Sequence, residues 1–211
     1  MLLFRAMSAL LSYPSEEMRK ALPEITDVIE TSSLVEASER RELLALVTEL
    51  AQGDLLEVEE QYVDLFDRGR ALSLHLFEHL HGDSRDRGEA MVDLKAIYAR
   101  AGFDLTTSEL PDYLPVVLEY LSCRDLDEAR AMLADCAHIL ATIARALIAR
   151  RSRYAAVLQA LLIIAGEAPI DAANVPPAKE RTETLDREWA EQPAFAGAPA
   201  PGGRVSGQPS R

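Results

Sequence analysis

The residues with the clearest potential for chemistry are two histidines and a glutamate in one short segment. His75, Glu78 and His79 form the pattern H-x-x-E-H. In inverted zinc peptidases this spacing places two imidazoles one helical turn apart, where they share a metal ion, and the glutamate activates water. Such a centre needs a third protein ligand, usually a later glutamate, and no glutamate occurs between Glu128 and Glu167. A zinc hydrolase is therefore the alternative, and ordinary hydrogen bonding by the three side chains is favoured.

The other chemistry-bearing residues indicate no catalytic centre. Cys123 and Cys136 lie too far apart for a Cys-x-x-Cys site and are too few for a disulfide framework, which favours a reducing compartment. The arginines at 145, 150, 151 and 153 form a small cluster without interleaved aromatic residues, as is typical of a helix end. Neither a glycine-rich phosphate loop nor a Ser/His/Asp set is evident. We expect no enzyme activity, no cofactor and no bound metal.

The charge balance of the chain bears on its partners. With 35 acidic and 22 basic side chains the net charge is -13, which opposes binding to the phosphate backbone of nucleic acids. A basic partner is the better expectation. The N-terminal run MLLFRAMSALLSYP is interrupted by Arg5 and is interpreted as a core helix rather than a signal peptide. The apolar run from Tyr154 to Ala165 is shorter than the roughly 20 residues that a membrane-spanning helix needs. A cytoplasmic protein without membrane insertion is predicted.

Start and stop signals for helices recur through residues 1–166, whereas alternating β-branched residues are absent. The sequence therefore predicts an all-α fold, a single helical bundle. Asp54 and Glu57 begin one helix whose apolar residues recur every three or four positions. Leucines at every seventh position from Leu126 to Leu147 predict one long central packing helix, although they would also suit a coiled coil.

Two further boundaries follow from local composition. The capping-box spacing of Thr106 and Glu109 predicts a helix that Pro115 kinks or restarts. Residues 167–211 are rich in Pro, Gly, Ala and Ser and carry few periodic apolar residues, so they offer little surface to bury. We expect a helical domain at 1–166 and a disordered tail at 167–211, dispensable for folding, with a short helix within the tail as an alternative.

One long run of residues is distinctive and unusual in sequence. Residues 62–79 read YVDLFDRGRALSLHLFEH, and the run continues through HGDSRDRG to MVDL at residue 94. This stretch closely resembles the NarJ-type nitrate reductase assembly chaperones, also called the nitrate reductase delta subunit. The resemblance covers about residues 1–166. Its signature positions are Asp67, Arg68, Gly69, Arg70, His75, Glu78, His79, His81, Gly82, Arg85, Arg87 and Gly88.

The resemblance extends to the superfamily of redox-enzyme maturation chaperones, which includes the TorD and DmsD types. That superfamily carries an E-x-x-D-H element, and the corresponding residues are Glu109, Asp112 and Tyr113, with tyrosine in place of histidine. The resemblance implies a TorD-like helical chaperone rather than an enzyme. Its peptide site is implied to lie between two groups of residues, one of Tyr62, Leu65 and Phe66 and the other of Glu109, Asp112 and Tyr113.

The implied partner is the catalytic (alpha) subunit of a nitrate reductase, bound through its N-terminal peptide while molybdenum cofactor is inserted and before membrane docking. Molybdenum cofactor biosynthesis proteins are further implied partners. A basic and apolar peptide would suit an acidic groove with an aromatic floor, with Asp112 receiving a cation of the peptide. Besides the zinc hydrolase, a structural helical subunit retained in a larger redox complex stays open as an alternative.

Overall fold

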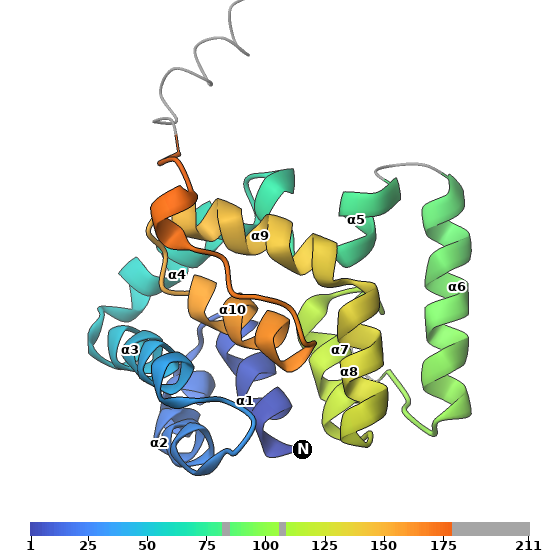
Figure 1. The fold of residues 1–211 in the computed structure, drawn as a ribbon, viewed down its shortest axis with the longest axis horizontal. Helices are drawn as coiled ribbons and strands as arrows, with labels where there is room; N and C mark the ends of the chain where they lie inside the picture. The colour runs from blue at the N-terminus through green and yellow to red at the C-terminus, as the bar shows by residue number, and fades with distance from the viewer. Residues whose placement is uncertain (82–84, 106–108, 179–211) are drawn as a thin grey trace, which may run out of the picture. The chain divides into compact units, whose positions relative to one another are not determined.

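The computed structural model describes residues 1–81, 85–105 and 109–178, which form α-helices joined by turns and loops (Figure 1). The all-α prediction is confirmed for these ranges. The helices are α1 (Leu2–Leu11), α2 (Glu16–Thr31), α3 (Ala37–Gln52), α4 (Leu55–Phe66), α5 (Leu76–His81), α6 (Arg85–Arg100), α7 (Leu114–Ser122), α8 (Leu126–Asp135), α9 (Ala137–Ala149) and α10 (Ala155–Ile164). Two short 3-10 turns are η1 (Arg70–Leu72) and η2 (Ala172–Asn174).

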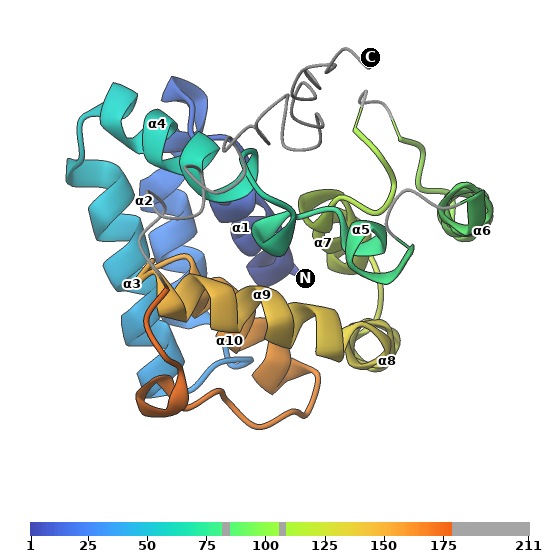
Figure 2. The same cartoon turned by 90° about the horizontal axis from the view of Figure 1, so that it is seen from above.

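The N-terminal helix α1 is the core helix that its apolar sequence predicts. It packs against α2, α7 and α10 (Figures 1 and 2). Phe4, Met7 and Leu10 share one face and are fully buried, and each such side chain contributes about 1.5–3 kcal/mol on burial. The Ser8 hydroxyl donates to the Pro115 carbonyl at 2.8 Å, which satisfies a buried polar group and ties α1 to α7.

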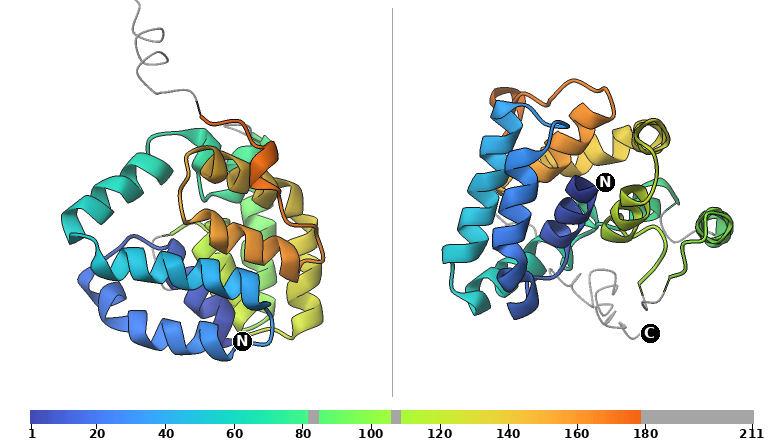
Figure 3. Two further views of the ribbon diagram at one scale, coloured as in Figure 1. Left: turned by 60° about the vertical axis from the view of Figure 1, so that its left-hand side comes forward. Right: turned by 90° about the horizontal axis from the view of Figure 1, so that it is seen from below.

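Helices α2 and α3 form an antiparallel pair (Figure 3). Arg40, near the start of α3, donates to the Ile29 carbonyl and to two carbonyls of the turn after α2. Arg19, near the start of α2, donates to two carbonyls at the end of α3. The last carbonyls of a helix have no intrahelical partner, so each guanidinium caps the C-terminus of the neighbouring helix.

The predicted single long helix is wrong, because the chain bends by 70° between α8 and α9. Cys136 sits at the corner with φ −102 and ψ 9, and its thiol donates toward the carbonyls of Met132 and Leu133. Leu133, Leu140 and Leu147 are nevertheless fully buried. Both α8 and α9 pack on α10, so the heptad pattern records burial against a shared neighbour rather than one continuous axis.

Helix α7 also begins later than the sequence predicts. Its first residue is Leu114, so Pro115 lies in the first turn, where a missing N–H costs nothing, and it introduces no kink. Thr106 of the predicted capping box lies outside the described residues.

The first compact unit extends beyond the expected boundary at residue 166, to Pro177. The Gln159 side-chain amide donates to the Ile170 carbonyl at 2.8 Å, and its oxygen accepts from the Ile170 N–H at 2.9 Å. Ile170 packs against the core. We call residues 167–177 the strap. The remainder of the expected tail, from residue 179, lies outside the described residues.

No helix in the described ranges is by itself long and apolar enough to cross a bilayer, and α8 and α9 reach the required length only as the bent pair.

Candidate functional site

The aromatic residues of α4 lie at the centre of the predicted site. Asp54 caps the helix by accepting from the backbone N–H groups of Leu56 and Glu57. One face then carries Tyr62 and Phe66, which are only 3% and 6% exposed. Their ring centroids are 4.8 Å apart. The third predicted member, Leu65, is half-buried and packs against the core.

A short antiparallel pairing brings the signature segment beside the E-x-x-D element. The Leu76 N–H donates to the Asp112 carbonyl at 3.0 Å, and the Leu114 N–H donates to the Leu74 carbonyl at 2.8 Å. His75 and Tyr113 form the bridge between these two bonds, and their ring centroids are 5.1 Å apart. The pairing therefore fixes His75 and Tyr113 as neighbours. It also brings Asp112 beside His75, although 37 positions separate these two residues in the sequence.

Tyr113 connects this bridge to α4. Its hydroxyl lies 3.1 Å from the Tyr62 hydroxyl, and Tyr62 in turn donates to the Leu11 carbonyl at 2.8 Å. Leu11 is the last residue of α1, so its carbonyl lacks an intrahelical donor and Tyr62 supplies one. The chain of hydroxyls thus joins α1, α4 and the bridge.

Asp112 has a different place from the one expected. Its side chain is fully buried, one oxygen accepts from the Phe77 N–H at 3.0 Å, and the other lies 3.4 Å from His75 Nδ1. This carboxylate caps the start of α5, where the first N–H groups lack intrahelical acceptors. Its hydrogen bond raises the pKa of His75, against the lowering that partial burial causes. Asp112 is therefore withdrawn from the surface that a peptide cation would reach.

A small cavity opens between α4, the bridge and the link after α1. Its volume is about 210 Å³. We call it the aromatic cavity, and it is lined by Tyr13, Tyr62, Phe66, Asp67, Leu74, His75, Glu109 and Tyr113. The sequence-based set lacked Tyr13 and Leu74. Tyr13 is 48% exposed. It precedes Pro14 in a link between helices, and this position is the one sequence signal that could have identified it.

Carboxylates give the aromatic cavity its charge. Asp67 and Glu109 are exposed members of its lining. Burial is the largest cause that raises the pKa of Tyr13, Tyr62 and Tyr113, and Asp67 adds to the rise in each. Asp67 is thus within electrostatic range of three tyrosines from three separate segments.

A second hollow of about 540 Å³ adjoins the aromatic cavity and shares Phe66, Asp67 and His75 with it. Its lining is formed by Phe66, Asp67, Arg68, Gly69, Arg70, Ser73, His75 and Glu78, all of which except Phe66 and Ser73 are positions of the family signature. Arg68 forms an ion pair with Asp64 at 2.8 Å. We call the two hollows together the signature groove.

The H-x-x-E-H residues have three different partners. His75 pairs with Asp112, Glu78 with Arg87 at 3.2 Å, and the His79 Nε2–H donates to the Ser73 carbonyl at 2.9 Å. In the described part of the chain no three His, Cys, Asp or Glu side chains are grouped as a metal site would require. Of the remaining signature positions, Gly88 is exposed on α6. Gly82 and the side chains of His81 and Arg85 lie outside the description.

Comparison with known proteins gives the groove a family context. The model of the family described as "Nitrate reductase delta subunit" matches residues 13–160. The nitrate reductase molybdenum cofactor assembly chaperone NarJ of Escherichia coli K12 is 42% identical over 192 residues, which cover 88% of this chain and 81% of that relative. A probable assembly chaperone NarJ of Bacillus subtilis is 33% identical over 75% of this chain and 85% of its own length. The chain therefore belongs to the nitrate reductase delta subunit family, that of the NarJ-type assembly chaperones, and is a chaperone rather than an enzyme.

Proposed function

We propose that this chaperone binds the N-terminal segment of the apo catalytic (alpha) subunit of a nitrate reductase in the signature groove. Binding keeps the subunit open for molybdenum cofactor insertion and delays membrane docking until the subunit is mature. Proteins that make or deliver the molybdenum cofactor are proposed as further partners, and the cytoplasm as the location.

The observation that carries this proposal is the convergence of the family signature on one groove. Residues from the turn at 67–70, from α5 and from the E-x-x-D element are remote in sequence, yet they line two adjoining hollows. The aromatic cavity is lined by four aromatic side chains with Asp67 and Glu109 exposed beside them, whereas Arg68 and Arg70 line the adjoining hollow. Aromatic walls supply apolar contact area, and carboxylates favour association with a basic segment. A basic and apolar part of a segment therefore matches the aromatic cavity.

Within this site the predicted residues have distinct proposed roles. Tyr62, Phe66 and Tyr113 form the apolar wall, and Glu109 contributes negative charge. Leu65 supports α4 from the core side. Asp112 holds the bridge and α5 in position rather than touching the peptide, because it is fully buried.

The test is calorimetric titration with the N-terminal peptide of a nitrate reductase catalytic subunit, beside a scrambled peptide of equal charge. Tyr13 is the suitable aromatic residue to replace because it lines the cavity and is 48% exposed, so Tyr13→Ala leaves the core intact. Loss of an aromatic contact of this kind weakens binding by about 1–2 kcal/mol. Leu56→Ala is the matched control, since Leu56 is 74% exposed on α4 and outside the groove.

Two results would count against the proposal. If the scrambled peptide binds as tightly as the true one, the protein recognises charge alone and no groove is needed. If the protein instead co-purifies at fixed stoichiometry with the mature, cofactor-loaded enzyme, it is a structural subunit of that complex.

A further inference from the structure

The aromatic cavity has the chemical composition of a site for a single cation. Aromatic rings present negative π faces, and a cation within about 6 Å of a ring centroid is attracted to them. Tyr13 and Phe66 both lie beside Tyr62, with ring centroids 5.6 Å and 4.8 Å from the Tyr62 centroid. Tyr113 adds a fourth ring to the lining through its hydroxyl contact with Tyr62.

The negative groups around this cavity exceed the positive ones. Asp67 and Glu109 are exposed, and neither takes part in an ion pair within the described residues. Asp67 is also the C-cap of α4, where the carbonyl end of the helix dipole is negative. The one lining group that carries a positive charge on protonation is His75, and its Nδ1 faces Asp112. The charge of the groups that line the cavity therefore favours a cation.

The size of the cavity limits the ligand to a single side chain. Its volume of about 210 Å³ lies below the roughly 300–1,000 Å³ of pockets that bind small molecules and cofactors. The cavity opens toward the adjoining hollow, with which it shares three lining residues, so a chain lying in the larger hollow is close enough to insert one side chain.

We propose that the aromatic cavity receives one arginine side chain of the bound N-terminal segment, with its guanidinium between the aromatic rings and the carboxylates of Asp67 and Glu109. Arginine fits better than lysine because its planar guanidinium stacks on rings and is more weakly hydrated than an ammonium group. Its five donors match the carboxylates and the tyrosine hydroxyls. This inference rests on the proposed function and assigns to Asp67 and Glu109 the cation contact first expected of Asp112.

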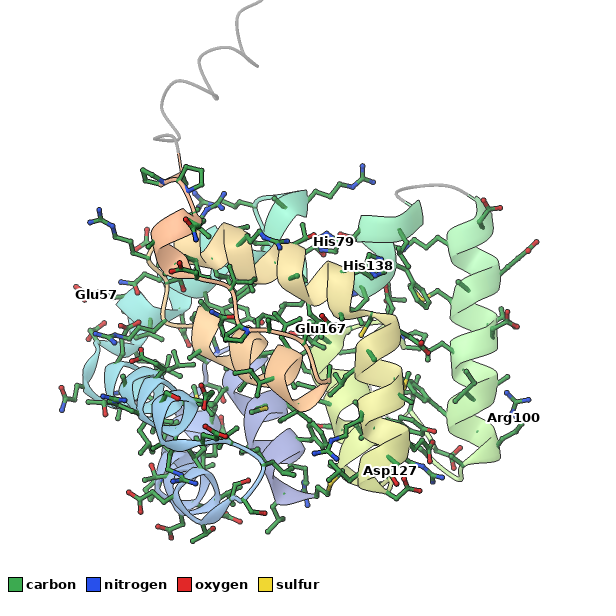
Figure 4. The ribbon with its side chains drawn as sticks, in the orientation of Figure 1. Glu57, His79, Arg100, Asp127, His138 and Glu167 are labelled. Carbon is green, nitrogen blue, oxygen red and sulfur yellow. The ribbon has the colours of Figure 1, made fainter. Side chains whose placement is uncertain are left out.

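The experiment is a double-mutant cycle between chaperone and peptide at fixed ionic strength. The chaperone variants are Asp67→Asn, Glu109→Gln and the double variant. Glu57→Gln is the control because it removes the same charge from an exposed position of α4 that lines neither hollow. Glu57 also lies well away from His79 of α5 (Figure 4). The probes are the N-terminal peptide of the catalytic subunit and versions in which each arginine or lysine is replaced by glutamine in turn, with each arginine also replaced by lysine.

Asp67→Asn and Glu109→Gln should each raise Kd about tenfold for the natural peptide, while Glu57→Gln changes it less than twofold. One arginine-replaced peptide should lose all sensitivity to the Asp67 and Glu109 variants, and its lysine version should recover only part of the affinity. Circular dichroism establishes that the variants are folded.

This experiment distinguishes failure of the arginine inference from failure of the proposed function. If the natural peptide binds wild type tightly and the Asp67 and Glu109 variants bind it equally well, the cation inference is wrong and the proposed function stands. If lysine replaces arginine without loss, the assignment of a guanidinium is overturned. If no peptide binds wild type, both the proposed function and this inference fall.

Discussion

Replacing Tyr62 with phenylalanine should destabilise the fold because it removes the hydroxyl that joins α1, α4 and the bridge. The ring and its packing stay. What is lost is the donor to the Leu11 carbonyl at 2.8 Å and the contact with the Tyr113 hydroxyl at 3.1 Å. Leu11 is fully buried at the end of α1, so its carbonyl is left without a donor. Such an orphaned acceptor costs about 1–3 kcal/mol.

Tyr154 offers a matched control in the same aromatic group. Its ring centroid lies 6.1 Å from that of Tyr62 and 5.2 Å from that of Phe66. Its hydroxyl is buried without a hydrogen-bond partner in the described part of the chain. A buried hydroxyl without a partner carries an uncompensated desolvation cost, so Tyr154→Phe should leave the free energy of unfolding unchanged or raise it by about 1 kcal/mol.

Urea unfolding followed by circular dichroism compares the two variants, with the m-value as the check on two-state behaviour. We expect Tyr62→Phe to lower the free energy of unfolding by about 2 kcal/mol, which corresponds to a fall in Tm of roughly 4–8 °C for a chain of this size. Equal changes in the Tyr62 and Tyr154 variants would refute the reasoning, because both remove one oxygen from one aromatic group and differ only in hydrogen bonding.

Further predictions concern pH, the strap and Asp112. The folded pKa of His75 is raised, so its contribution to stability is complete below its unfolded pKa of about 6.5 and is lost as pH rises through the folded pKa. Urea titrations at a series of pH values should therefore show a smaller loss between pH 6 and 8 for His75→Gln than for wild type. Truncation after Glu167 should lower the free energy of unfolding by about 2 kcal/mol, because it removes the contacts of residues 168–177. Truncation after Ala178 should leave the free energy of unfolding unchanged. Equal thermal melts of the two truncated proteins would show that the strap adds no stability. Asp112→Asn should cost about 1–3 kcal/mol of stability yet leave the salt dependence of peptide binding as in wild type, and a weaker salt dependence would mean that Asp112 meets the peptide after all.

The helical fold could be predicted because its signals are local. Asp54 accepts from the first N–H groups of α4, as its position before an apolar stripe predicts. The N-terminal apolar run likewise forms a buried helix, as its local sequence predicts. The apolar spacing and the capping residues that predict a helix lie within the helix or next to it. A window of a dozen residues therefore contains most of the information needed to predict it.

The misplaced elements depend on contacts that no local window contains. Three of the heptad leucines, Leu133, Leu140 and Leu147, are fully buried in α8 and α9. The bend at Cys136 is compatible with this burial because both helices pack on α10. The strap lacks apolar periodicity, and its order rests on the side-chain amide of Gln159, which pairs with the Ile170 backbone in place of a strand. Composition reports how much apolar area a segment offers, not whether a distant side chain satisfies its backbone.

Asp112 and Tyr113 are adjacent in the sequence but have different roles in the structure. Asp112 lies in the turn immediately before the isolated bridge that Tyr113 forms with His75. The buried Asp112 carboxylate caps α5, and Tyr113 lines the aromatic cavity. The aspartate is needed although it is inaccessible, because His75 and the Phe77 N–H both depend on it and His75 lines both hollows of the groove. A substitution at Asp112 thus acts on the groove through the position of His75, whereas a substitution at Tyr113 acts on the cavity wall itself.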